Sequence, residues 1–153
     1  MSERRAAHET AIHALVSAAR AGDDPRVIAR MRCGWAIFGE RQFLRGYSLL
    51  LPDPVVASLN SLNGAARAQF LLDMAQLGDA LLAVTGAVRI NYAIFGNLEP
   101  ALHAHIVPRY ADEPAHLATQ QPWAYDWSRA PAFDAHASRQ LAAALRRELA
   151  GAR

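Results

Sequence analysis

The ten residues PALHAHIVPR, at positions 100–109, hold two histidines one residue apart in a short apolar run between two prolines. Such a run predicts a β-strand, in which successive side chains point to opposite faces of the sheet. His103 and His105 would share one face, while Leu102 and Ile106 pack on the other. From the rise of a strand, the roots of the two imidazoles lie roughly 6.5–7 Å apart. Both rings would then be able to contact one phosphate or one metal ion.

The segments on either side of this run predict an α+β domain with an antiparallel sheet. Residues 64–85 carry apolar side chains at steps of three and four, a stripe typical of a helix that covers a core. Short links between the strands favour antiparallel pairing, with helices packed against the sheet. Strands are expected within 34–52, 87–97 and 102–108, and additional N- and C-terminal helices within 2–22, 23–31 and 132–151.

The length of the chain, 153 residues, suits one domain with its own core. We expect a single domain over 1–153, with its core at about 34–110, N-terminal helices within 3–31, and a C-terminal loop and helix within 111–153. Residues 111–131 are polar, proline-containing and aromatic. They predict a surface loop packed by its own aromatic side chains, or alternatively a lid or a dimer contact.

The composition excludes several classes of function. A single cysteine, Cys33, rules out an internal disulfide and a cysteine-rich zinc site. All 16 basic residues are arginines, so a lysine nucleophile is impossible. A net charge of +2 gives no reason to expect a specific nucleic-acid partner. Without a long apolar window or the apolar core of a signal peptide, we expect a cytoplasmic protein with no membrane span. The abundant alanine and arginine are typical of a bacterial genome rich in GC.

Three interpretations of the histidine pair follow from its chemistry. In the first interpretation, both rings are hydrogen-bonded histidines on a half-buried strand without a catalytic role. A second interpretation is a metal site, since His-X-His on a strand is a frequent ligand pair. A third ligand would then come from Glu99, His116 or a remote carboxylate. The spacing of these residues from the histidines is not typical of a metal site. The third interpretation is nucleophilic catalysis on phosphorus, in which a neutral imidazole attacks a phosphoryl centre and water hydrolyses the phosphohistidine.

The longer stretch INYAIFGNLEPALHAHIVPRY, residues 90–110, resembles the histidine triad (HIT) family of nucleotide hydrolases and transferases. The pattern of that family is His-φ-His-φ-His-φ-φ, where φ is apolar, often followed by Pro-Arg. It falls on residues 101–107, so Ala101 stands in place of the first histidine. The resemblance covers about 34–110 and agrees with the expected α+β fold. It implies a homodimer that cleaves a phosphoanhydride or phosphoramidate of a nucleotide, with dinucleoside polyphosphates and nucleoside phosphoramidates as substrate classes.

The same resemblance implies roles for individual residues near the phosphate. His103 falls on the nucleophile of the family, which forms a nucleotidyl intermediate. His105 falls on the third histidine, which contacts the phosphate. Asn97 lies where the family has a polar residue near the phosphates, and Tyr47 stands where the family often has a fourth histidine. The chemistry requires no metal or cofactor from the protein.

For the nucleoside, the resemblance points to the stretch WAIFGERQF, residues 35–43. Ile37 and Phe38 would flank the base, although plain sheet core explains both residues equally well. The ribose contact of the family falls near Gly39, and Glu40 is the nearest candidate.

Ala101 leaves two functions open. Alanine has no hydrogen-bond donor, so one contact to the phosphate or the leaving group is lost. The protein is then expected to be a hydrolase of reduced activity or, as the alternative, a nucleotide-binding module with little or no turnover.

Overall fold

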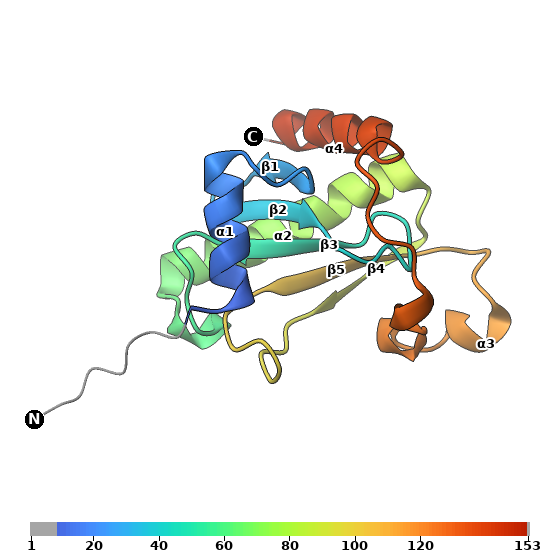
Figure 1. Ribbon diagram of the computed structural model, residues 1–153, viewed down its shortest axis with the longest axis horizontal. Helices are drawn as coiled ribbons and strands as arrows, with labels where there is room; N and C mark the ends of the chain where they lie inside the picture. Colours follow the sequence, from blue (N-terminus) through green and yellow to red (C-terminus); the bar gives the residue numbers. More distant parts are fainter. Residues whose placement is uncertain (1–8, 153) are drawn as a thin grey trace, which may run out of the picture.

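Five antiparallel strands in the order β1-β2-β3-β5-β4 form the sheet of this protein. The structure is a computed structural model that describes residues 9–152 (Figure 1). It confirms the α+β class that the sequence predicts. The strands are β1 (Val27–Arg30), β2 (Gly34–Phe38), β3 (Ser48–Pro52), β4 (Arg89–Ala93) and β5 (Ala104–Arg109); the helices are α1 (Ala11–Ala21), α2 (Gly64–Thr85), α3 (Ala115–Ala118) and α4 (Arg139–Gly151), with 3-10 turns η1 (Leu59–Ser61), η2 (Pro122–Ala124) and η3 (Trp127–Arg129).

One face of the sheet is covered by α2 and α4 and holds the main core. The apolar stripe predicted on residues 64–85 lies here, with Phe70, Leu77 and Leu81 fully buried. Ile106 and Leu102 contribute from the strand side, as their alternation with the histidines predicts. No helix among residues 9–152 is long and apolar enough to cross a membrane.

The opposite face carries two smaller apolar clusters with the histidines between them. Helix α1 crosses this face, and the segment containing α3, η2 and η3 lies beside β5 and β4 (Figure 1). Under α1, the side chains of Ile12 and Val16 pack on Ile37 and Ala101. The second cluster surrounds Tyr47. On this face, part of β5 therefore lies between α1 and the segment that contains α3, η2 and η3.

The helix predicted over 23–31 is wrong, because residues 27–30 form β1. Helix α1 ends at Gly22, whose φ of 76° is the left-handed conformation that glycine adopts at helix ends. The few residues that follow are too short for a stable helix of their own. Pairing with β2 satisfies their backbone and buries Ile28.

The ends of the chain also differ from expectation. The first part of the predicted N-terminal helix, residues 1–8, lies outside the described residues. At the other end, α4 begins at Arg139 instead of residue 132. Phe133, expected on the helix, lies before it and stacks on Phe38 with ring centroids 5.2 Å apart.

Candidate functional site

The two histidines lie side by side on the face opposite α2, as the alternation of the strand predicts. His105 is in β5, and His103 immediately precedes that strand. Their ring centroids are 5.0 Å apart and their planes meet at 72°. His103 is only 8% exposed, and His105 is half-buried. The rings are thus held close enough to act on one small group.

A backbone carbonyl fixes the tautomer of His103. Its Nδ1 lies 2.8 Å from the carbonyl oxygen of Ala101. A carbonyl only accepts hydrogen bonds, so Nδ1 carries the proton and donates it. In the neutral ring, Nε2 then has a free lone pair. This is the state that an attacking imidazole requires.

His105 has the complementary arrangement. The hydroxyl of Tyr47 lies 2.7 Å from Nδ1 of His105. Burial, together with the nearby charge that His103 carries when protonated, lowers the pKa of His105 to about 4, so the ring is neutral at pH 7. Burial also raises the pKa of Tyr47, so its hydroxyl keeps its proton. In the tautomer in which Nδ1 accepts the hydrogen bond from Tyr47, Nε2 of His105 carries the ring proton and serves as a donor.

Gly39 makes room for this tyrosine. A Cβ at Gly39 would lie 2.2 Å from the ring of Tyr47, much closer than real contacts. The tyrosine side chain therefore occupies the space that any side chain at position 39 would need. The resemblance places Tyr47 where the family often has a fourth histidine, and the structure brings the hydroxyl of this residue to His105.

Aromatic side chains from the segment 111–131 form a wall beside His105. The ring of Trp123 meets His105 edge to face, with centroids 5.0 Å apart. Phe95, from the loop between β4 and β5, contacts both Trp123 and His105. Behind Trp123, the ring of Trp127 packs on Tyr47. The segment therefore borders the histidine site, and sequence reasoning did not assign Trp123 or Phe95 to it.

A buried arginine holds this wall against the sheet. Arg109, the last residue of β5, forms an ion pair with Glu113 at 2.9 Å, and both side chains are almost fully buried. It also donates to the side chain of Asn91 and to the carbonyls of Leu117 and Gln120. The hydrogen-bonding capacity of the guanidinium is thus used inside the fold. No signal in the sequence pointed to this pair, because a spacing of four brings side chains together on a helix and Arg109 ends a strand.

A cavity of about 250 Å³ opens beside His103. Its walls come from residues 57–60, which precede and begin η1, and from residues 94–96 and 101–103. Ser58 and Asn60 supply polar side chains at its rim. Phe95 also borders a second, larger groove of about 640 Å³ that runs along β4. Phe95 therefore borders both the cavity at His103 and this groove.

Asn97 and Glu40 are not brought to the histidines. Asn97 is exposed in the loop between β4 and β5, and it does not line the cavity. Glu40 is exposed after β2 and borders a different cavity, together with Asp24 and Phe133. A role for either residue in binding a substrate remains a prediction.

Ile37 and Phe38, expected beside a base, are fully buried in the core. Successive side chains of a strand point to opposite faces, which places these two on different sides of the sheet. Phe38 belongs to the core under α2 and α4, whereas Ile37 packs under α1. The structure therefore favours the alternative interpretation, sheet core, for both residues.

Within the part of the chain that the structure describes, the histidines do not gather further metal ligands. Among residues 9–152, no group of three or more histidine, cysteine, aspartate or glutamate side chains is placed to hold a metal ion. The third ligands considered from the sequence, Glu99 and His116, do not complete such a group.

Solved structures with the same architecture are histidine triad proteins. A histidine triad protein from Bradyrhizobium japonicum is 26% identical with a TM-score of 0.68, and the match covers 85% of this chain and 94% of that chain. A hypothetical histidine triad nucleotide-binding protein from Sulfolobus tokodaii gives a TM-score of 0.70 at 12% identity, with 90% and 92% covered. A zinc-bound histidine triad family protein from Mycobacterium smegmatis gives 0.63 at 23% identity, with 90% and 91% covered. Protein-family models and curated proteins give no match.

Proposed function

We propose that this chain, which has the fold of the histidine triad (HIT) proteins, binds a nucleoside phosphate. In this proposal it cleaves a phosphoanhydride or phosphoramidate bond through a His103-nucleotidyl intermediate. The observation that carries the proposal is the hydrogen bond from Nδ1 of His103 to the carbonyl of Ala101. It leaves a lone pair on Nε2 of a residue that lines a cavity. Dinucleoside polyphosphates and nucleoside phosphoramidates are the substrate classes, and a bacterial cytoplasm is the proposed setting.

The proposed reaction has two displacement steps. Nε2 of His103 attacks phosphorus, and the bond from phosphorus to the leaving oxygen or nitrogen breaks as that atom takes the electron pair. The ring becomes a cation while the carbonyl of Ala101 still accepts its Nδ1 proton. Water then attacks the same phosphorus while the bond from phosphorus to Nε2 breaks and its electron pair returns to the ring. The proton that water loses balances the proton that the leaving group takes up from solvent, and the products are the nucleoside monophosphate and a neutral His103. Nε2–H of His105 donates to a phosphoryl oxygen, where negative charge accumulates in both steps.

A nucleotide-binding module without turnover is the second candidate function. It is favoured by the surroundings of Ala101, which is 3% exposed and packs in the apolar cluster with Ile12 and Val16. That position supplies no donor to a leaving group. The histidine pair would then bind phosphate without completing the reaction.

The resemblance also implies a homodimer. Strand β4 lies at the edge of the described sheet, where its outer backbone groups are free to pair with another strand. Val88 and Tyr92, at this edge, are large exposed apolar side chains. We propose that a second copy of the chain covers this edge.

The enzyme and the binding module are distinguished by trapping the intermediate. Brief incubation with a nucleoside 5′-phosphoramidate is expected to add one nucleotidyl group to the protein, and peptide mass spectrometry should locate it on His103. The control is His103→Gln, which lacks the attacking nitrogen and should carry no adduct. Turnover without any adduct on His103 would contradict the nucleophile assignment. Binding without adduct or turnover would support the module.

Chelation is expected to leave activity unchanged. The proposed chemistry uses two imidazoles and a tyrosine, and residues 9–152 do not assemble a third metal ligand around them. Activity on a nucleoside phosphoramidate should therefore persist after dialysis against EDTA. Loss of activity that one equivalent of zinc or manganese restores would support the metal interpretation instead.

A further inference from the structure

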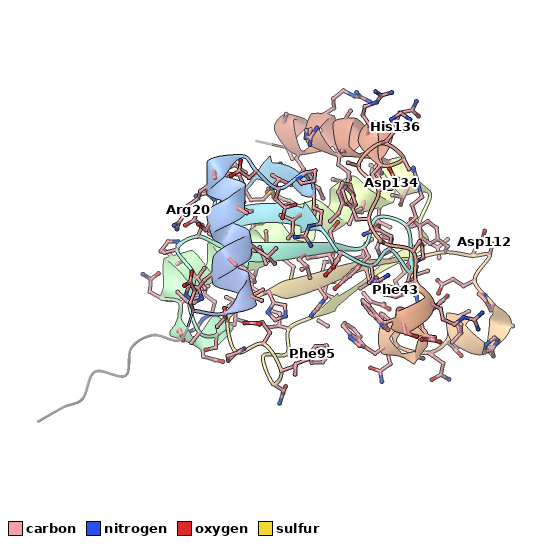
Figure 2. The ribbon with its side chains drawn as sticks, viewed as in Figure 1. Arg20, Phe43, Phe95, Asp112, Asp134 and His136 are labelled. Carbon is pink, nitrogen blue, oxygen red and sulfur yellow. The ribbon has the colours of Figure 1, made fainter. Side chains whose placement is uncertain are left out.

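Phe95 is an exposed aromatic side chain next to the histidine pair. It is 56% exposed, although a phenyl ring on a protein surface gains nothing from contact with water. Its centroid lies 5.9 Å from the ring of His105 and 4.9 Å from that of Trp123. Figure 2 shows Phe95 projecting from the loop between β4 and β5, apart from the helical core. An exposed ring held at this place is available to a bound ligand.

The residues first expected to flank a base are not available. Ile37 and Phe38 are fully buried on opposite faces of the sheet. The aromatic surface that remains beside the histidines consists of Phe95 and the half-buried Trp123. A planar group attached to a phosphate at His103 therefore has these two rings as its nearest stacking partners.

The groove on the far side of Phe95 suits the edges of a nucleobase. Phe95 and Trp123 both border it, and so do the exposed side chains of Thr119, Gln120 and Gln121. Amide and hydroxyl groups donate and accept hydrogen bonds, as the edges of bases require. The cavity at His103 also borders Phe95, so the phosphate site and the groove meet at this ring.

Resting on the proposed function, we propose that Phe95 and Trp123 form the site that stacks the nucleobase of the bound nucleotide. The phosphate occupies the cavity at His103, and the base lies against Phe95 and Trp123 at the end of the groove where β4 finishes, which leaves the Val88 end of this edge to the second copy. Phe95 is a specificity residue in this arrangement, because it contacts the base and leaves the reacting phosphorus to the histidines.

The test compares a ligand with a base to one without it. Isothermal titration calorimetry on the full chain would measure the dissociation constants of AMP, GMP and ribose 5-phosphate. Phe95→Ala is expected to weaken the binding of either nucleotide by about 5- to 150-fold, the range that base stacking on an aromatic side chain covers. Ribose 5-phosphate should bind the variant as it binds the native chain.

Leu98→Ala is the matched control, because Leu98 is 98% exposed in the same loop and should not contact the base. Phe95→Tyr keeps an aromatic face and should restore nucleotide binding. Quenching of tryptophan fluorescence by AMP should disappear in Trp123→Phe if that indole reports the stacked base.

Each remaining outcome overturns the inference in a recognisable way. Equal losses for nucleotides and ribose 5-phosphate in Phe95→Ala would show a general disturbance of the loop instead of stacking. Phe95 does not stack a base if Phe95→Ala binds nucleotides as tightly as the native chain does. The same conclusion follows if the native chain binds ribose 5-phosphate as tightly as AMP, and in both cases the proposed function would still stand. A native chain that binds none of the three ligands would overturn the proposed function itself.

Discussion

Replacement of His103 by alanine is expected to lower turnover of a nucleoside phosphoramidate by about 10⁴-fold or more, as removal of a nucleophile does in other enzymes. The variant lacks the nitrogen that attacks phosphorus, and no lysine exists in the chain to replace it. His105 does not substitute, because Tyr47 holds its Nδ1 and its Nε2 carries the proton in the proposed state. Single-turnover kinetics would measure the loss, with calorimetry of AMP binding alongside.

Nucleotide affinity should fall much less than the rate, since the proposed base site and His105 remain in place. His136→Ala is a suitable control, because His136 is exposed at the start of the segment leading into α4 (Figure 2). A folded His103→Ala variant with nearly native turnover would show that another group attacks phosphorus. A parallel loss of binding and rate would instead point to a role for His103 in holding the phosphate.

The parts of the fold with strong local patterns were predictable from the sequence. Helix α2 has a long apolar stripe that needs only one partner surface, and it forms within the predicted residues 64–85. The shared face of His103 and His105 follows from strand alternation alone, with Leu102, Ala104 and Ile106 packed on the other side.

Elements that depend on distant contacts were not predictable in this way. Strand β1 is four residues long, and its pairing with β2 outweighs a weak local preference for helix. The position of the aromatic wall depends on the ion pair between Arg109 and Glu113 and on backbone carbonyls further along the segment. Composition indicates that aromatic residues are present between 111 and 131, and it does not indicate which surface they cover.

The pairing of the two histidines was predictable from the sequence, and their surroundings were less so. The rings of His103 and His105 lie side by side, as strand alternation suggests, whereas the contact of Tyr47 with His105 depends on the fold. The residues expected around the nucleoside do not line one common site. Phe38 and Ile37 are buried in apolar clusters on opposite faces of the sheet, and Glu40 lies at another cavity. A motif defines which atoms react, whereas a binding pocket is formed by loops whose packing is not encoded in short-range patterns.

Ala101→His is expected to raise the rate of cleavage at least tenfold, which corresponds to about 1.4 kcal/mol of barrier. Ala101 lines the cavity at His103, so part of a new imidazole has space there. A single well-placed donor to an oxyanion is worth about 10²–10³ in rate. The gain should be smaller than this, because the side chain at 101 also contacts the cluster under α1.

The contact of residue 101 with the apolar cluster under α1 is also expected to lower the free energy of unfolding of Ala101→His. Adding a ring to a well-packed apolar cluster destabilises a protein by about 1–3 kcal/mol, and a urea titration of the variant should show a loss of this size. Ala101→Phe is the matched control, since it adds a ring of similar shape without a donor. It should lower the free energy of unfolding in the same way and leave the rate at or below the native value.

If Ala101→His is folded and no faster than the native protein in single-turnover experiments, then the missing donor is not what limits the reaction. In that case the site binds nucleotides without turning them over, or catalyses a different reaction that does not use a donor at position 101.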